Sequence, residues 1–92
     1  MARHPDSSPQ DFWQAVLNEH WPPAAVARSL RDVPSDRQIP VVARVVYKDD
    51  GEQQLAGVAV RWTQQHVCVR IGDRRLATGL VWLAPADVWR AT

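Results

Sequence analysis

Residues 39–62 read IPVVARVVYKDDGEQQLAGVAVRW, and this segment predicts a β-hairpin. Its first half, residues 41–48, is rich in β-branched side chains and apolar on both faces near its centre, as is typical of a buried strand. The tetrapeptide at 49–52, Asp-Asp-Gly-Glu, is a hairpin turn signal. Residues 55–62 form the returning strand, in which Gly57 indicates a bulge or a bend. We therefore expect a sheet built outward from this antiparallel pair.

Three further short strands are expected after the hairpin. Residues 66–71 alternate Val or Ile with His, Cys and Arg, which is the period of a half-buried strand. Residues 80–83, Leu-Val-Trp-Leu, form a short apolar strand, residues 84–88 form one 3₁₀ turn, and residues 89–90 form a last short strand. Five short strands at this spacing predict a small sandwich or barrel rather than parallel βαβ units.

Two short helices are expected before the sheet, following a flexible terminus at residues 1–8. Residues 8–11, Ser-Pro-Gln-Asp, combine an N-cap serine, a proline suited to the first helical position and an acid near the positive end of the helix dipole. The apolar stripe of this first helix comprises Phe12, Trp13, Val16, Leu17 and Trp21. The Pro-Pro pair at 22–23 ends it. A second short helix is expected over about residues 23–31.

The order of the last two strands resembles the ending of an SH3-like barrel. In such a barrel a short apolar strand, a 3₁₀ turn and a brief closing strand follow one another. Here the matching pieces are LVWL at 80–83, PADV at 85–88 and WR at 89–90. The string IPVVARVVY…DGEQ…RW…HVCVRIGDRRL…VWLAPADV is also similar to small uncharacterised proteins of Arg-rich actinobacterial type.

Together with this resemblance, the pattern predicts an α+β fold: two short N-terminal helices followed by a five-stranded antiparallel SH3-like barrel. We expect a single domain over residues 9–92, with a helical extension at 9–38 and the barrel at 39–92. The resemblance implies no activity, because small barrels host many unrelated functions. Recognition of proline motifs is not expected, since the paired tyrosines of peptide-binding SH3 domains are absent and Tyr47 is the only tyrosine.

Composition narrows the class of protein further. The chain has 92 residues, of which 46% are hydrophobic and 23% charged, and this is ordinary for a globular protein of one domain. No apolar run approaches the roughly 18 residues that a membrane span needs. The N-terminus lacks the apolar region of a signal peptide, and the one cysteine, Cys68, fits a reducing compartment. We therefore expect a cytoplasmic protein that does not associate with membranes.

No constellation of residues points to catalysis, to a metal or to a cofactor. His66 and Cys68 share one face of a strand, but a structural zinc site needs four ligands and no second pair exists. A thiol in a strand interior stays neutral, which makes Cys68 a poor nucleophile. The four glycines never cluster into a phosphate-binding loop. We expect neither enzymatic activity nor a bound metal or cofactor.

Binding to another protein, or self-association, is the leading hypothesis. Five tryptophans in so short a chain are a surplus of aromatic residues, and tryptophan is a frequent anchor of interfaces. Because the net charge is only +1, apolar contacts are favoured over charged ones. The expected anchors are Trp13, Trp21 and Trp89.

The alternative hypothesis is a DNA- or RNA-binding module. Guanidinium groups on the predicted barrel could contact phosphates while neighbouring indoles stack on bases. The candidate arginines are Arg44, Arg61, Arg70, Arg74 and Arg75. This alternative requires them to lie on one face with an exposed tryptophan between them; arginines that scatter and form ion pairs would weigh against it.

Overall fold

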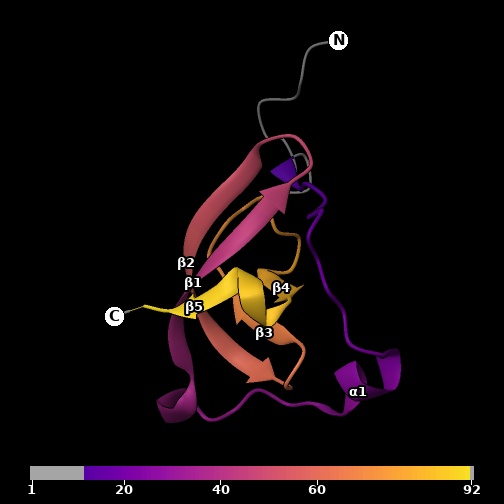
Figure 1. The fold of residues 1–92 in the computed structure, drawn as a ribbon, viewed down its shortest axis with the longest axis vertical. Helices are drawn as coiled ribbons and strands as arrows, with labels where there is room; N and C mark the ends of the chain where they lie inside the picture. Colours follow the sequence, from indigo (N-terminus) through magenta and orange to yellow (C-terminus); the bar gives the residue numbers. More distant parts are fainter. Residues whose placement is uncertain (1–11, 92) are drawn as a thin grey trace.

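A computed structural model describes residues 12–91 of the chain, and Figure 1 shows its arrangement. The elements are α1 (Ala24–Ser29), η2 (Ser35–Arg37), β1 (Ile39–Tyr47), β2 (Gly51–Trp62), β3 (Val67–Arg70), β4 (Leu80–Leu83), η3 (Pro85–Asp87) and β5 (Val88–Arg90). Here η2 and η3 are single 3₁₀ turns. The long β1–β2 hairpin dominates the molecule, as its sequence predicts.

All five strands belong to one antiparallel sheet, in the order β4-β3-β2-β1-β5. The five strands and the 3₁₀ turn between the last two are where the sequence predicts them. The prediction of a closed barrel is wrong, because β4 and β5 form the two edges and do not pair with each other. Both are short, with four and three residues, and residues from before α1 occupy the side of the sheet that their pairing would close.

The prediction of two N-terminal helices is also wrong. The second one is present as α1, but residues 13–22 of the first are not helical, and we call this segment the strap. The expected cap at residues 8–11 and the terminus at 1–8 lie outside the described residues. In the strap the apolar side chains are not buried as one stripe: Val16 is buried, whereas Trp13, Leu17 and Trp21 are 45%, 64% and 61% exposed.

The strap pairs with an edge of β1 and does so through its own backbone. β5 covers only residues 41–43 of that edge. Farther along, the Ala15 carbonyl accepts a hydrogen bond from the Lys48 N–H at 2.8 Å, and the Leu17 N–H donates to the Val46 carbonyl at 2.7 Å. A helix would have used these same strap groups internally, so the edge of β1 competes with the helix and wins.

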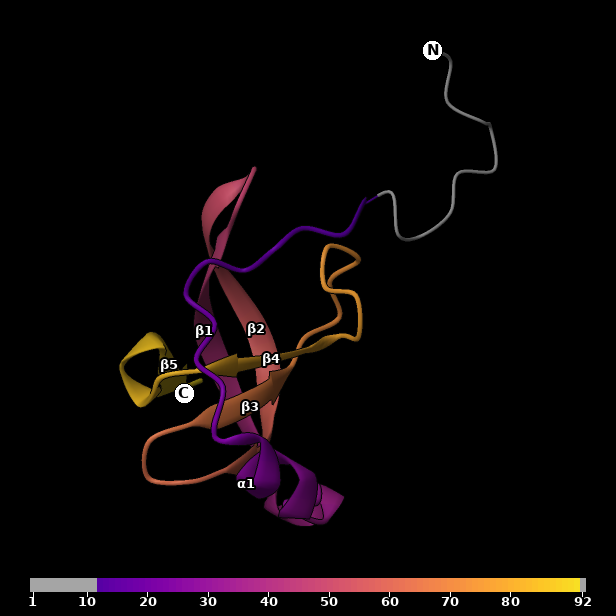
Figure 2. The same cartoon turned by 90° about the vertical axis from the view of Figure 1, so that its right-hand side faces the viewer.

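Other strap residues bond to the opposite side of the opening. The His20 N–H donates to the Trp82 carbonyl of β4 at 2.8 Å, and the Gln14 N–H donates to the Arg75 carbonyl at 2.9 Å. Figure 2 shows the strap descending across the strands to α1. The strap therefore bridges the open side of the sheet from β1 to β4.

Asn18 continues the pairing of β1 with its side chain. Its Oδ1 accepts a hydrogen bond from the Val46 N–H at 2.9 Å, and its Nδ2 donates to the Arg44 carbonyl at 2.8 Å and to Oδ2 of Asp87 at 3.2 Å. The strap backbone pairs with β1 as far as Val46, and β5 pairs with residues 41–43. The Asn18 carboxamide takes the place of a strand between these two stretches of the edge. Edge groups of β1 that would otherwise lack a partner are satisfied.

The main core lies on the inner face of the sheet. Every second residue of β1 from Val41 to Tyr47 is buried there, and these side chains pack with Val69 and Leu83 from the other strands. Val16 of the strap joins the same cluster and covers it from the open side. Each fully buried aliphatic side chain contributes roughly 1.5–3 kcal/mol to folding.

A smaller cluster occupies the outer face, because neighbouring residues of a strand point to opposite sides. Its buried members are Val60, Cys68 and Trp82, and Leu30, just after α1, packs against them. The register of β2 against β3 shifts near Val60, and the Val60 carbonyl accepts a hydrogen bond from the Val33 N–H at 2.8 Å. The chain around α1 is thereby attached to the outer face.

Gly57 has a role that differs from the expected bulge, which lies three residues later, near Val60. A Cβ atom at Gly57 would come within 2.7 Å of the Arg70 carbonyl oxygen and within 2.8 Å of the Val69 and Ile71 side chains. No other residue type can therefore occupy this position without displacing the end of β3. Gly57 is needed for close packing rather than for an unusual backbone angle.

We predict that Gly57→Ala destabilises the fold by about 1–3 kcal/mol, because backbone has to move to accommodate the methyl group. Urea unfolding followed by tryptophan fluorescence measures the change. Gly72→Ala is the matched control, since a Cβ there meets nothing within 4 Å. Equal stability of the two variants would contradict the packing argument.

We predict that Asn18→Ala costs about 1–3 kcal/mol of stability, since it leaves the Val46 N–H and the Arg44 carbonyl without partners. Asn18→Asp is a second test of the same contacts: it keeps an acceptor for the Val46 N–H but places a carboxylate oxygen against the Arg44 carbonyl and the Asp87 carboxylate. Both variants are expected to melt below wild type. An alanine variant as stable as wild type would show that the side chain does not support the edge of β1.

Candidate functional site

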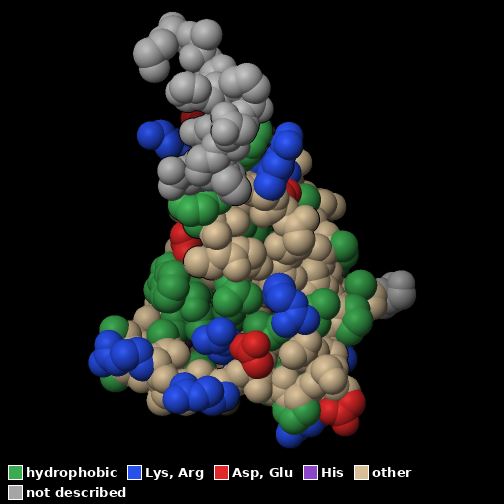
Figure 3. All heavy atoms as spheres, turned by 180° about the vertical axis from the view of Figure 1, so that it is seen from behind, with side chains coloured by type: hydrophobic (Ala, Val, Ile, Leu, Met, Phe, Trp, Pro, Cys, Tyr) green, Lys and Arg blue, Asp and Glu red, His purple; other side chains and the backbone are tan. Residues whose placement is uncertain are grey.

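An apolar groove of about 520 Å³ lies between the strap and the β4 edge. On the strap side it is lined by Ala15, Val16 and Trp21, and on the other side by residues 76–78 and by β4. Ala27 and Arg28 of α1 lie at one end. Figure 3 shows hydrophobic side chains gathered on the rear face of the molecule, with Lys or Arg side chains beside them. The groove exists because the strap contacts β4 at His20 and the adjoining loop at Gln14, without a continuous ladder between these points.

Trp21 is the most exposed of the five tryptophans, and its side chain forms part of the groove wall. Its ring lies 6.2 Å from that of Trp82, tilted by 46°. Its Nε1 donates a hydrogen bond to Oε2 of Glu19 at 2.6 Å, which holds the indole in a defined orientation. Trp82 itself is almost fully buried and belongs to the outer cluster. A fixed, exposed indole beside an apolar depression is the usual composition of a binding hot spot.

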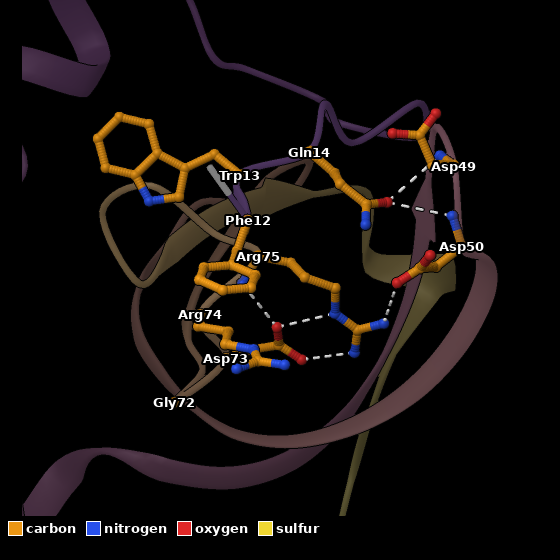
Figure 4. A pocket seen from close by; sticks show the side chains of 9 residues that line it. All are labelled: Phe12, Trp13, Gln14, Asp49, Asp50, Gly72, Asp73, Arg74 and Arg75. Carbon is orange, nitrogen blue, oxygen red and sulfur yellow. Dashed lines mark hydrogen bonds and ion pairs between the residues drawn. The ribbon is translucent and has the colours of Figure 1, made fainter. Parts of the chain in front are cut away.

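A second hollow, of similar size, is polar, and several of the groups that line it bond to one another (Figure 4). The Arg75 guanidinium bridges Asp73, at 2.7 Å, and Asp50, at 3.0 Å. The hydrogen bonds from Arg75 to Asp73 hold the pKa of the Asp73 carboxyl down at about 2. The Gln14 Oε1 accepts hydrogen bonds from the Asp49 and Asp50 N–H groups. This network ties the strap, the hairpin turn and the loop after β3 to one another.

Tyr47 lies under this network with its hydroxyl buried. The Arg75 guanidinium carbon stands 4.3 Å from the centre of its ring, a cation–π contact. Among the described residues the hydroxyl has no hydrogen-bond partner. Burial, reinforced by the Asp73 carboxylate, raises the pKa of Tyr47 to about 12.

A third, smaller slot of about 160 Å³ lies at the other end of the core, flanked by Trp62 and Trp89. The three expected anchors are all exposed, but each borders a different hollow: Trp13 the polar one, Trp21 the groove and Trp89 the slot. The structure does not bring them together into one surface. Sequence reasoning missed the contribution of Arg28 and of β4 to the groove, because no pattern in the chain shows where the strap crosses.

The five candidate arginines for nucleic acid have intramolecular contacts. Arg44 pairs with Glu52 and Asp87, and Arg61 pairs with Asp32. The remaining contacts are those of Arg75 with Asp50 and Asp73, Arg70 with Gln38, and Arg74 with the ring of Phe12 at 4.3 Å. These ion pairs and hydrogen bonds within the chain weigh against the nucleic-acid alternative.

His66 and Cys68 are both buried. The His66 ring stacks on that of His20 with the ring centres 4.5 Å apart, and its Nδ1 lies 3.2 Å from the His20 carbonyl. Burial raises the pKa of the Cys68 thiol to about 11, so it remains a thiol near neutral pH. Within residues 12–91, no three His, Cys, Asp or Glu side chains form a group that could hold a metal ion.

In comparisons with known proteins, no protein family, no curated protein and no solved structure matches the chain. Among the described residues, no helix has the length and apolar character required to cross a membrane. The interpretation of the site therefore rests on its own geometry.

We predict that Tyr47 does not ionise near pH 10 in the folded protein. Its pKa in the folded state lies above the ordinary value of 10, so its contribution to stability is complete below about pH 10 and is lost as the pH rises towards 12. As the only tyrosine, it can be followed by its phenolate absorbance in the ultraviolet. The titration midpoint should fall to the ordinary value in concentrated urea; equal midpoints in both states would contradict the burial of the hydroxyl.

Proposed function

We propose that this chain is a small, non-enzymatic protein-binding module and that the groove between the strap and β4 is its binding site. The observation that carries the proposal is the exposure of Trp21, 61%, at the wall of an apolar groove. Monomeric proteins rarely leave large apolar side chains gathered on one surface unless that surface binds something. Leu17, on the same strap, is exposed to a similar extent.

The contrast with the other hollows supports the choice of the groove. The polar hollow is bounded by charged groups that already bond to one another, so a ligand there would have to displace them. The slot beside Trp89 has less than a third of the volume of the groove. Nucleic acid is the weaker candidate, because two of the arginines that it would need, Arg44 and Arg75, are each paired with two carboxylates of the chain. A cytoplasmic location is part of the proposal and is supported by the single, buried Cys68.

We predict that partners captured by the tagged wild-type chain are lost with Trp21→Ser and retained with Trp89→Ser. Both indoles are exposed, so both variants are expected to fold, which their melting temperatures check. Trp13→Ser, on the strap but outside the groove, is a further arm. If every partner survives in folded Trp21→Ser, the groove is not the binding site, and loss with Trp89→Ser alone would assign the function to the slot.

A further inference from the structure

The end of the groove near α1 carries positive charge with unused hydrogen-bonding capacity. The guanidinium of Arg28 forms no ion pair or hydrogen bond with any residue described by the structure. The Arg61 guanidinium uses its Nε to bind Asp32 at 2.9 Å, and its two terminal NH₂ groups have no partner among residues 12–91. Arg28 and Arg61 both line the groove. Since a guanidinium offers five N–H donors, most of their capacity is open to a ligand.

Two acidic residues offset part of this charge, because Asp32 pairs with Arg61 and Glu19 is itself part of the groove lining. Neither of them forms an ion pair with Arg28, and Glu19 accepts the Trp21 Nε1 hydrogen bond instead. Arg31 adds a further positive charge next to α1, although one of its NH₂ groups is bound to carbonyls of the chain. The groove therefore has two chemically different parts: an apolar body beside β4 and a cationic end beside α1.

We propose that the partner of this groove is a protein segment that combines a large apolar side chain with a neighbouring carboxylate. This inference rests on the function proposed above and names the chemistry of the partner. The apolar side chain fits the body of the groove, against Leu80, Val81 and Trp82. The carboxylate meets Arg28 and Arg61, whose planar guanidinium groups suit two-point hydrogen bonding to a carboxylate.

A nucleic acid fits this surface less well than an acidic peptide does. An oligonucleotide presents a phosphate at each residue and is held by a track of cations along its backbone. The groove offers cations at one end only, and the rest of its lining is largely apolar. A single carboxylate beside an apolar anchor matches this asymmetry.

The experiment measures binding of fluorescein-labelled short peptides to the full chain by fluorescence anisotropy. One set carries a central Leu, Phe or Trp with Asp or Glu on one flank. The second set is identical except that Lys replaces each acid, and a single-stranded thymidine oligonucleotide is the third probe. We expect the acidic set to bind wild type and the Lys set to bind at least about tenfold more weakly.

Variants locate the interaction on the groove. Arg28→Glu should weaken the acidic peptides about tenfold or more, Arg28→Gln should weaken them less, and Trp21→Ser should abolish binding. The matched control is Arg90→Glu, an equal charge reversal at an exposed residue of β5 that lines the slot and not the groove. Its affinity should equal that of wild type, and all variants are compared only after their melting temperatures show that they fold.

The outcomes separate the two proposals. If peptides of both charges bind equally and only Trp21→Ser abolishes binding, the groove is a binding site but the acidic partner is overturned. Preferential binding of the oligonucleotide, unchanged affinity in Arg28→Glu, or no binding by any peptide overturns the acidic partner as well. Whether the groove binds protein at all is decided by the capture experiment with Trp21→Ser, whatever the peptides do.

Discussion

The exposed edge of β1 is the constraint on which the rest of the structure depends. β1 has nine residues, and β5, the strand that pairs with the edge of β1 facing away from β2, covers only three of them. The remaining backbone groups of the edge need partners if the hairpin is not to remain open to other chains. The strap supplies them with the backbone of Ala15 and Leu17 and with the carboxamide of Asn18. From this one requirement follow the position of the strap, the covering of the core by Val16 and the groove along β4.

The sheet is the part of the fold that sequence reasoning can predict. In residues 39–62 the β-branched content, the turn signal and the apolar pattern all agree, and local preference coincides with the tertiary outcome. For the strap, the local preference and the tertiary outcome conflict. Phe12, Trp13, Val16, Leu17 and Trp21 fall at helical spacing, yet the segment bonds to β1 and β4 instead. Nothing local in a single sequence reveals a strand edge contributed by residues far along the chain.

The candidate site shows the same division. Trp13, Trp21 and Trp89 are exposed, but their placement beside three separate hollows depends on packing that the sequence does not display. For the five arginines the sequence indicates only their positions, three of them around one loop and two on strands that are expected to pair. Their partners, among them Asp32 for Arg61 and Asp87 for Arg44, come from segments that only the folded chain brings close. Arg28 differs from these arginines, because its guanidinium has no acidic partner among the described residues and is free to bind a ligand.

The strap also determines the order in which the protein can assemble. It precedes every strand in the chain, so during synthesis it leaves the ribosome before any strand that it contacts. Asn18 bonds to Asp87, 69 residues away in sequence, and such a distant closure is entropically costly until the intervening sheet has formed. The strap can pair with β1 once the hairpin has formed, but its bonds to Trp82 and to Asp87 have to wait until β4 and η3 are in place. A segment that precedes all five described strands therefore completes its contacts only after the last of them has been made.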